Sequence, residues 1–265
     1  MMLYYLGPRG SHTERAALKF SELMGIETTP ADSIYSVFEE VLEGNYGVVP
    51  TENSVEGSVN LTLDLLFENQ VRILAETSLE IRHSLLGFDE KKIEKVLSHP
   101  QALAQCRKFI REHGWEAVAT KSTSEAAKIV SELGDPRLAA IASKETGELY
   151  GLKVLEEDVQ DYPNNKTRFI LIGPEGKSLS QQLGPPVKTS LFIELENVPG
   201  SLYRALGIFA KRGINLTRIE SRPSRIDLGY YVFYLDFEGL PDGDLFLELE
   251  SYAKFIKPLG SYPVF

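Results

Sequence analysis

Residues 164–172, NNKTRFILI, place polar side chains directly before an apolar run. The apolar part has the composition of a buried strand, and an ordinary loop leading into such a strand would be built from Gly and Ser. This strand begins instead with two amides, an ammonium, a hydroxyl at Thr167 and a guanidinium at Arg168. These groups can hydrogen-bond a ligand, and a guanidinium fits a carboxylate. The stretch is therefore too polar to be an ordinary strand entry.

A second polar cluster follows the apolar run at residues 46–50. It reads TENS and comprises Thr51, Glu52, Asn53 and Ser54. In an open α/β sheet, ligands bind at the carboxyl edge of the strands, where this cluster would stand. Asn53 and Glu56 also have the spacing of a capping box, so Asn53 alone could be structural. Four consecutive polar residues exceed what a cap requires.

Residues 6–17, LGPRGSHTERAA, combine a Gly-Pro turn with the start of a helix. Ser11 and Glu14 have capping-box spacing, which is sufficient to explain them as structural. The alternative is an anion site. Gly7 and Gly10 would allow a ligand close to free amides at the helix N-terminus, and Arg9 would add positive charge.

Another helix start is predicted in residues 98–106, SHPQALAQC. Ser98 or His99 can cap it, and Pro100 suits its first turn. Gln101 and Gln105 share one face because they are four residues apart. That face is either part of a site or simply solvated, and the sequence hardly separates the two.

Composition excludes several classes of function. The net charge of −10 argues against a nucleic-acid partner, which needs a basic surface. No run of 18 apolar residues could span a membrane, and the N-terminal residues lack the features of a signal peptide. The single cysteine, Cys106, forms no internal disulfide and fits the cytoplasm, while four His without ligand spacing argue against a structural metal site.

Apolar runs alternate with amphipathic helices up to about residue 173, which predicts a largely parallel sheet covered on both faces. Residues 72–88 interrupt this rhythm and are expected to form extended strands that carry the chain into a second lobe. Residues 173–187 have the Gly, Pro and Ser content of a linker. Residues 187–265 then follow a β-α-β-β-α-β order, which is the ferredoxin-like pattern.

Taken together in this order, the motifs GPRGSxTxxAA, VPTENSVEGSV, SHPQALAQC and NNKTRF resemble those of the monofunctional prephenate dehydratases. The resemblance covers essentially the whole chain, and ENVPGSL and INLTRIESRP resemble the motifs of the regulatory ACT domain. It implies a catalytic region of two α/β lobes, like a periplasmic binding protein, with the active site between them. The implied boundaries are residues 1–175 for the catalytic domain, 176–186 for the linker and 187–265 for the α+β ACT domain.

The resemblance also implies the chemistry. A prephenate dehydratase is a lyase that needs no cofactor and no metal, because aromatisation drives the loss of CO₂ and water. The implied proton donor is Thr167, and Arg168 would hold a substrate carboxylate. Further catalytic residues by this resemblance are Asn53, Glu52, Ser98 and Gln105, and further substrate-binding residues are Ser11, Thr13, Ser54 and Phe169.

Regulation is implied in the same way, as feedback inhibition by phenylalanine bound between the ACT domains of a homodimer or homotetramer. The residues concerned are Asn197, Val198, Pro199, Gly200, Ser201, Leu202, Glu220 and Ser221. The alternative is that these motifs only build the dimer interface.

Three positions depart from the family pattern. His12 stands where Phe or Tyr is usual, Lys121 where some bifunctional relatives carry Glu, and Ser201 where Ala is common. Two other functions stay open: a non-catalytic sensor of amino acids or organic acids, which would have no need of Thr167, and dehydration of arogenate instead of prephenate.

Overall fold

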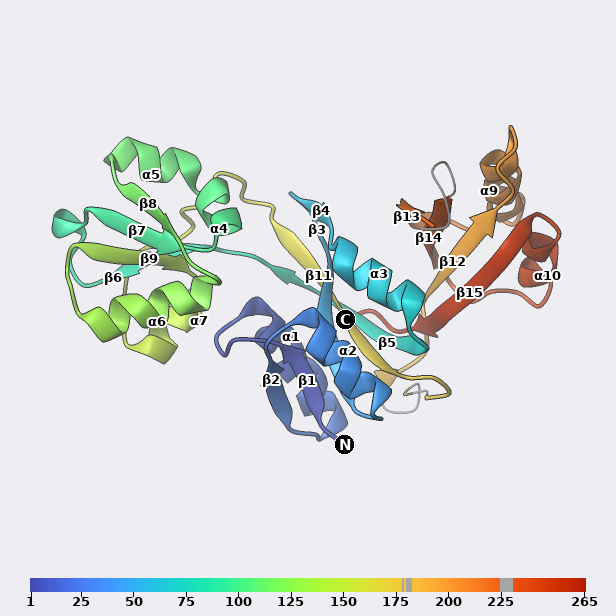
Figure 1. The fold of residues 1–265 in the computed structure, drawn as a ribbon, viewed down its shortest axis with the longest axis horizontal. Helices are drawn as coiled ribbons and strands as arrows, with labels where there is room; N and C mark the ends of the chain where they lie inside the picture. Colours follow the sequence, from blue (N-terminus) through green and yellow to red (C-terminus); the bar gives the residue numbers. More distant parts are fainter. Residues whose placement is uncertain (178, 180–182, 225–230) are drawn as a thin grey trace.

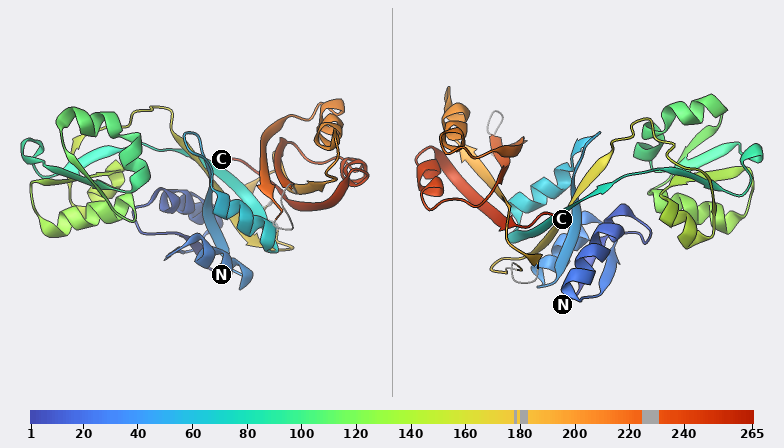
Figure 2. Two further views of the ribbon diagram at one scale, coloured as in Figure 1. Left: turned by 45° about the horizontal axis from the view of Figure 1, so that its top comes forward. Right: turned by 180° about the vertical axis from the view of Figure 1, so that it is seen from behind.

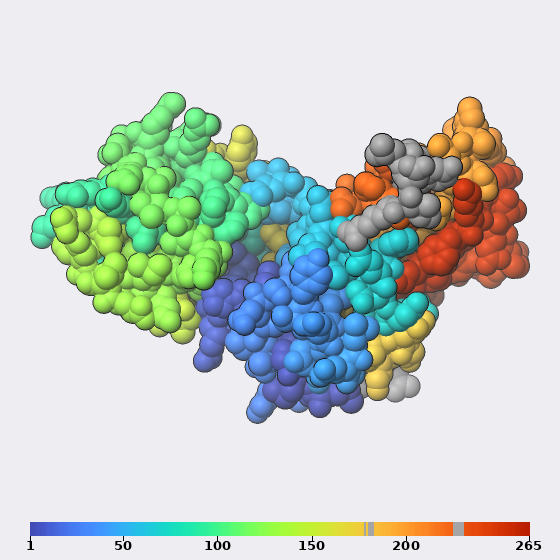
Figure 3. Space-filling view, viewed as in Figure 1, coloured from blue at the N-terminus to red at the C-terminus, as the bar shows by residue number. Residues whose placement is uncertain are grey.

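The computed structural model describes residues 1–177, 179, 183–224 and 231–265. Three sheets form three units that lie in a row (Figure 1, Figure 3). The first lobe lies in the centre, the second lobe at one end and the C-terminal unit at the other. No helix in the described part of the chain is long and apolar enough to cross a membrane.

The first lobe has a six-stranded sheet in the order β2-β1-β3-β11-β5, with β4 paired to β3. Helix α1 covers one face, where its Ala16 and Phe20 pack on Leu171, while α2 and α3 cover the face that carries Ile170. The elements are β1 (Leu3–Leu6), α1 (His12–Met24), β2 (Thr28–Ala31), α2 (Ile34–Leu42), β3 (Tyr46–Asn53), β4 (Gly57–Ser58), α3 (Asn60–Glu68), β5 (Val71–Glu80) and β11 (Lys166–Pro174).

The second lobe has a five-stranded sheet in the order β10-β6-β9-β7-β8, with helices on both faces. Its elements are β6 (Ser84–Gly87), the short 3₁₀ helix η1 (Glu90–Lys92), β7 (Lys95–Ser98), α4 (Pro100–Gln105), α5 (Arg107–His113), β8 (Glu116–Ala119), α6 (Thr123–Leu133), β9 (Leu138–Ala142), α7 (Lys144–Tyr150) and β10 (Lys153–Glu156). The helix predicted to start in residues 98–106 begins at Pro100 and is interrupted at Cys106, after which α5 begins at Arg107.

Both lobes differ from the expected parallel sheet in one respect. β1, β2 and β3 are parallel, as are β7, β8 and β9, but β5, β11, β6 and β10 run antiparallel to their neighbours. The cause is the double crossing between lobes. The chain leaves along β5, as expected for residues 72–88, and returns into β11 (Figure 2). The two connecting segments hydrogen-bond to each other, with the Ile81 amide donating to the Asn165 carbonyl at 2.8 Å.

The C-terminal unit confirms the β-α-β-β-α-β prediction and has the sheet order β13-β14-β12-β15. Residues 244–256, DLFLELESYAKFI, have the pattern of one helix in the sequence, but the helix ends at Glu250 and the last strand already begins at Ala253. The elements are β12 (Lys188–Leu195), α9 (Ser201–Lys211), β13 (Leu216–Pro223), β14 (Tyr231–Glu238), α10 (Leu245–Glu250) and β15 (Ala253–Tyr262).

The two faces of this third sheet have different partners. Helices α9 and α10 pack on one face, whereas Phe192 and Tyr234 on the other belong to the same apolar cluster as α2 and α3 of the first lobe. After β15 the chain continues along β5, where Val264 pairs with Glu76. The C-terminal unit is therefore joined to the first lobe by a shared core and by backbone pairing.

The predicted linker, residues 176–186, lies between β11 and β12, but residues 178 and 180–182 fall outside the described part of the chain. Leu179 and Leu183 are buried against α1 in the core of the first lobe. Part of this segment is thus packed, a feature that its Gly and Pro content did not indicate.

Candidate active site

A cleft of about 960 Å³ lies between the two lobes. The first lobe lines it with the loop before α1 and with the ends of β3 and β11, and the second lobe with the N-terminal turns of α4 and α6. The crossing segments contribute Ile81, His83 and Asn165. The cleft therefore has the position expected for the active site of a two-lobed fold.

Thr167 and Asn53 are paired residues of the adjacent strands β11 and β3, and both line the cleft. The Asn53 side-chain nitrogen donates to the Thr167 hydroxyl oxygen at 2.9 Å. The Asn53 side-chain oxygen accepts from the amides of Val55 and Glu56, which fixes the orientation of its amide group. Thr167 therefore uses its oxygen as an acceptor, and within the described residues its hydroxyl hydrogen has no acceptor. That hydrogen is available to a ligand.

A chain of buried amides extends this pair into the second lobe. Asn53 also donates to the side-chain oxygen of Asn165 at 2.7 Å, and Asn165 donates to that of Gln105 at 2.9 Å. Gln105 lies at the end of α4 and donates in turn to the Glu56 carboxylate at 3.0 Å. The chain fixes the two lobes relative to each other at the base of the cleft.

Two histidines lie side by side in the cleft with ring centroids 6.3 Å apart. The Gln105 oxygen lies 2.9 Å from His83 Nε2, so this nitrogen carries the hydrogen, while His83 Nδ1 has no partner among the described residues. His12 is partly buried, but both of its ring nitrogens are cut off from solvent and have no partner in the described part of the chain either. Burial lowers the pKa of His12 to about 3 and also lowers the pKa of His83. Both rings are therefore neutral near pH 7.

The charged residues of the cleft are at its rim. Arg9, Lys121 and Lys128 are exposed cations, and Asp32 and Glu125 are the acidic residues among the lining side chains. The deep residues Asn53, Thr167, Gln105 and His83 are all buried and neutral. The cleft thus has three cations and two carboxylates near its rim and an uncharged interior, in a chain whose net charge is −10.

The sequence left two interpretations open for the start of α1, an anion site or a capped helix. The structure shows a capped helix. Ser11 accepts from the Glu14 amide at 3.2 Å, and the Glu14 carboxylate accepts from the Gly10 amide at 2.5 Å. These amides are therefore occupied: Ser11 caps the helix, and Glu14 reaches back to the amide of the residue before the cap. Ser11 and Thr13 still line the cleft, but Ser11 also donates to the Leu6 carbonyl at 3.2 Å.

Four residues predicted from the family resemblance lie outside the cleft. Ser98 is fully buried and donates to the Ile141 carbonyl at 2.5 Å, inside the second sheet. Ser54 is exposed and bonds to the backbone of Asn164 and Lys166. Glu52 and Arg168 form an ion pair at 3.1 Å on the face of the first sheet that points to the C-terminal unit. Alternate residues of a strand face opposite sides, so Asn53 and Thr167 face the cleft while Glu52 and Arg168 do not.

The remaining predicted residues lie as follows. Phe169 is buried and lines the cleft next to Thr167. Asn165 and His83 were not predicted as site residues. The polar cluster at residues 164–168 signalled the first, whereas a lone His between Arg82 and Ser84 in the extended segment carries no such signal.

The predicted effector residues 197–202 form the loop before α9 and its first turn. Gly200 adopts a φ of 82° at the helix start, and no side chain caps the helix. Glu220 and Ser221 lie on β13, and the Glu220 carboxylate accepts a hydrogen bond from Ser58 of the first lobe at 2.9 Å.

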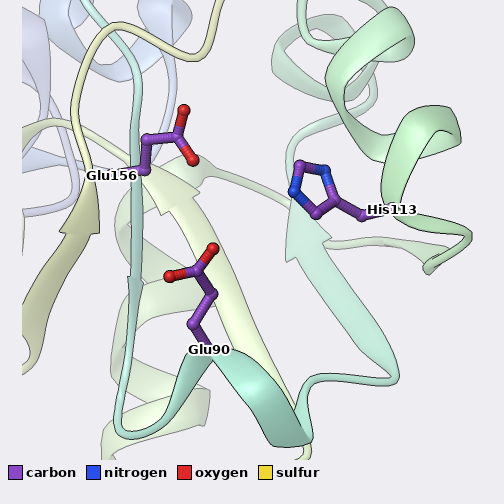
Figure 4. Close-up of side chains that lie close together, drawn as sticks. All are labelled: Glu90, His113 and Glu156. Atoms are coloured by element: carbon purple, nitrogen blue, oxygen red, sulfur yellow. The ribbon is translucent and has the colours of Figure 1, made fainter.

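One group of potential metal ligands occurs among the described residues, outside the cleft. Ligand atoms of Glu90, His113 and Glu156 lie within 4.8 Å of one another on the surface of the second lobe (Figure 4). All three side chains are exposed, and none lines the cleft.

Comparisons with known proteins agree with the geometry. The family profile of prephenate dehydratase matches residues 3–177, and that of the ACT domain matches residues 189–250. A prephenate dehydratase of Methanocaldococcus jannaschii is 50% identical over 98% of this chain and 97% of its own.

Solved structures extend the comparison. A prephenate dehydratase from Arthrobacter aurescens in complex with L-Phe has a TM-score of 0.87 and 34% identity over 99% of this chain and 90% of that one. GqqA, described as a novel type of quorum quenching acylase, has a TM-score of 0.84 and 29% identity over 100% of this chain and 98% of that one. The family profile covers most of the chain, and the Methanocaldococcus jannaschii relative is similar over nearly its full length. The chain therefore belongs to the prephenate dehydratase family and carries a C-terminal ACT domain.

Proposed function

We propose that this chain converts prephenate into phenylpyruvate, CO₂ and water in the cleft between the lobes, with Thr167 as the proton donor. The observation that carries the proposal is the hydrogen bond from Asn53 to Thr167 at 2.9 Å. It occupies one acceptor position of the hydroxyl oxygen and leaves the hydroxyl hydrogen free to be donated to a ligand.

The reaction has a simple balance. The bond between the ring and its carboxylate breaks, its electron pair enters the ring, and the ring hydroxyl leaves with one proton as water. Carbon dioxide is a good leaving group, but hydroxide is not, so proton delivery to the departing oxygen is the step that needs the enzyme. A Thr hydroxyl is a weak acid. The Asn53 amide stabilises the negative charge that develops on Thr167 as its proton moves, because this donor is already in place.

The charge distribution in the cleft suits both the binding of prephenate and the departure of CO₂. Prephenate is a dianion, and the rim cations Arg9, Lys121 and Lys128 would attract it. A cation bound to the departing carboxylate would stabilise the reactant and lose that contact as neutral CO₂ forms. The neutral rings of His12 and His83 avoid this ground-state stabilisation.

Regulation by phenylalanine is the second part of the proposal. The loop before α9 leads into a helix start without a side-chain cap, which suits an amino-acid carboxylate, and Glu220 would hold the ammonium group. Residues 197–202 and Ser221 would complete the site, at an interface between the ACT domains of a homodimer or homotetramer. The buried thiol of Cys106 suits an enzyme of the cytoplasm.

The test follows phenylpyruvate formation by purified protein from prephenate, with and without phenylalanine, and from arogenate in parallel. We expect turnover of prephenate that phenylalanine suppresses. Binding of prephenate by folded protein without any turnover would favour the sensor alternative. Faster turnover of arogenate would reassign the substrate while leaving the role of Thr167 in place.

A further inference from the structure

Strand β3 contains an extra residue directly before the proposed catalytic pair. Glu52 pairs with Arg168 and Pro50 pairs with Phe169, so Thr51 has no opposite residue in β11. This irregularity is a β-bulge, which leaves one residue outside the ladder and redirects the side chains next to it. The bulge lies two residues from Asn53.

A side chain of the ACT domain holds the bulge. Arg218 of β13 donates to the Thr51 hydroxyl at 3.0 Å and to the Thr51 carbonyl at 3.1 Å. It also donates to the Ser58 hydroxyl of β4 at 2.7 Å, and its guanidinium lies 5.1 Å from the ring centre of Tyr234. Arg218 is 7% exposed, so the guanidinium is committed to these contacts.

Thr51 and Ser58 belong to the two strands of a small hairpin that contains Asn53. β4 pairs with the end of β3, with Ser58 opposite Glu52 and Gly57 opposite Asn53. Arg218 therefore hydrogen-bonds to both strands of the hairpin from the side of the ACT domain. The Asn53 side chain leaves the opposite side of the hairpin into the cleft, where it donates to Thr167.

We propose that Arg218 is a positioning residue for catalysis: by holding Thr51 and Ser58 it sets the place from which Asn53 orients the Thr167 hydroxyl. The ACT domain is then a structural part of the active site. Its sheet fixes a hairpin of the first lobe, and it does more than receive an effector.

The hydrogen bonds around the hairpin also include Glu220, a residue of the proposed effector site. The link to phenylalanine that follows from this rests on the proposed function. Ser58 donates to the Glu220 carboxylate at 2.9 Å while it accepts from Arg218. An ammonium group that occupied Glu220 would compete for the oxygen that now receives the Ser58 hydrogen bond. Loss of that bond would loosen the hairpin and displace Asn53. Binding of phenylalanine at Glu220 would in this way disturb the hydrogen bond from Asn53 to Thr167.

The decisive variant is Arg218→Met, which keeps the length of the side chain and removes its donors. We expect kcat to fall about 10- to 100-fold with KM within about threefold, since a shift of the order of 1 Å in a catalytic group can have effects of this size. Arg218→Lys, which keeps the charge but not the fork, should lie between Arg218→Met and the wild type. The remaining activity of Arg218→Met should respond only weakly to phenylalanine.

Arg222→Met is the matched control. Arg222 also lies on β13 and pairs with Asp64 of the first lobe at 2.8 Å, and among the described residues no hydrogen bond or ion pair joins it to the hairpin. It should keep kcat within about twofold of wild type, as a contact that serves only domain packing would. If Arg218→Met does not fold, Thr51→Val and Ser58→Ala, which each remove one hydroxyl that accepts from Arg218, carry the test through the same kcat and KM measurement.

Wild-type kcat in Arg218→Met, or equal losses of kcat in Arg218→Met and Arg222→Met, would overturn the inference, as would unchanged kcat in both hydroxyl variants. An inactive wild-type enzyme would instead refute the proposed function, so the two failures are distinguishable.

Discussion

Thr167 and Arg168 are neighbours in β11, but their side chains lie on opposite faces of the sheet and meet different domains. Thr167 lines the cleft and accepts from Asn53, whereas Arg168 lies 3.1 Å from Glu52 and 3.6 Å from Asp236 of the ACT domain. One peptide unit thus separates the proposed proton donor from the charged contact between domains. A displacement of Arg168 is therefore expected to move Thr167.

Thr167→Val tests the proton donor with little change in volume. Removal of the hydroxyl should lower kcat by about 10²- to 10⁴-fold, the range of general acid catalysis, and leave substrate binding nearly intact. The measurement is steady-state kinetics together with calorimetric binding of prephenate. Thr167→Ser, which keeps a hydroxyl, should retain clearly more activity than Thr167→Val, and equal activity of the wild type and Thr167→Val would remove Thr167 from the mechanism.

Asn53→Asp tests the direction of the hydrogen bond. A carboxylate cannot donate to the Thr167 oxygen and would instead accept the hydroxyl hydrogen that the substrate needs. We expect kcat to fall about as far as in Thr167→Val, and the double variant to be little worse than either single one, because the two residues act as a unit. Additive losses would show that Asn53 and Thr167 contribute independently.

Glu76→Gln tests the buried charges between the domains. Glu76 is 3% exposed and its carboxylate lies 2.7 Å from the Lys188 ammonium, which is also buried. Loss of one partner leaves the other charge buried without compensation, which destabilises a protein by roughly 3–5 kcal/mol. The free energy of unfolding in denaturant measures the effect.

Lys95→Met serves as the control for this measurement. Lys95 and Glu116 are 2.9 Å apart, close to the Lys188–Glu76 distance, but both side chains are exposed. Surface pairs of this kind contribute about 0–1 kcal/mol. A similar loss of stability in Lys95→Met and Glu76→Gln would mean that burial does not distinguish the two pairs.

Much of this organisation could be predicted from periodicity and motifs. Strand–helix alternation indicated sheets covered by helices on both faces, the extended segment at residues 72–88 indicated the crossing into a second lobe, and polar residues at strand ends indicated Asn53 and Thr167. Period-two alternation also implies that Arg168 and Thr167 point in opposite directions. The sequence did not indicate what contacts the face of β11 that carries Arg168, because only tertiary structure places the ACT sheet against the first lobe.

The site residues that sequence reasoning missed were missed for one physical reason. His83 and Asn165 lie on the two crossing segments and become neighbours of Gln105 only when both lobes are assembled. Neither has a spacing pattern of its own, since the contacts join residues far apart in the sequence. Ser98 is the opposite case: its position before a helix matched a site, but its hydroxyl is satisfied inside the second sheet.

His12→Phe tests the pH dependence of stability. The folded protein holds the pKa of His12 at about 3, below its ordinary value of 6.5, so the unfolded chain binds a proton more readily. Unfolding is therefore favoured as the pH falls below 6.5, at up to about 1.4 kcal/mol per pH unit for this group, until the folded pKa is reached. His83 adds a slope of the same sign, since burial lowers its pKa as well. His12→Phe should flatten the curve of unfolding free energy between pH 6.5 and 4 by the equivalent of about one proton. An unchanged slope would show that His12 titrates alike in the folded and unfolded protein, and hence that its burial in the cleft does not lower its pKa.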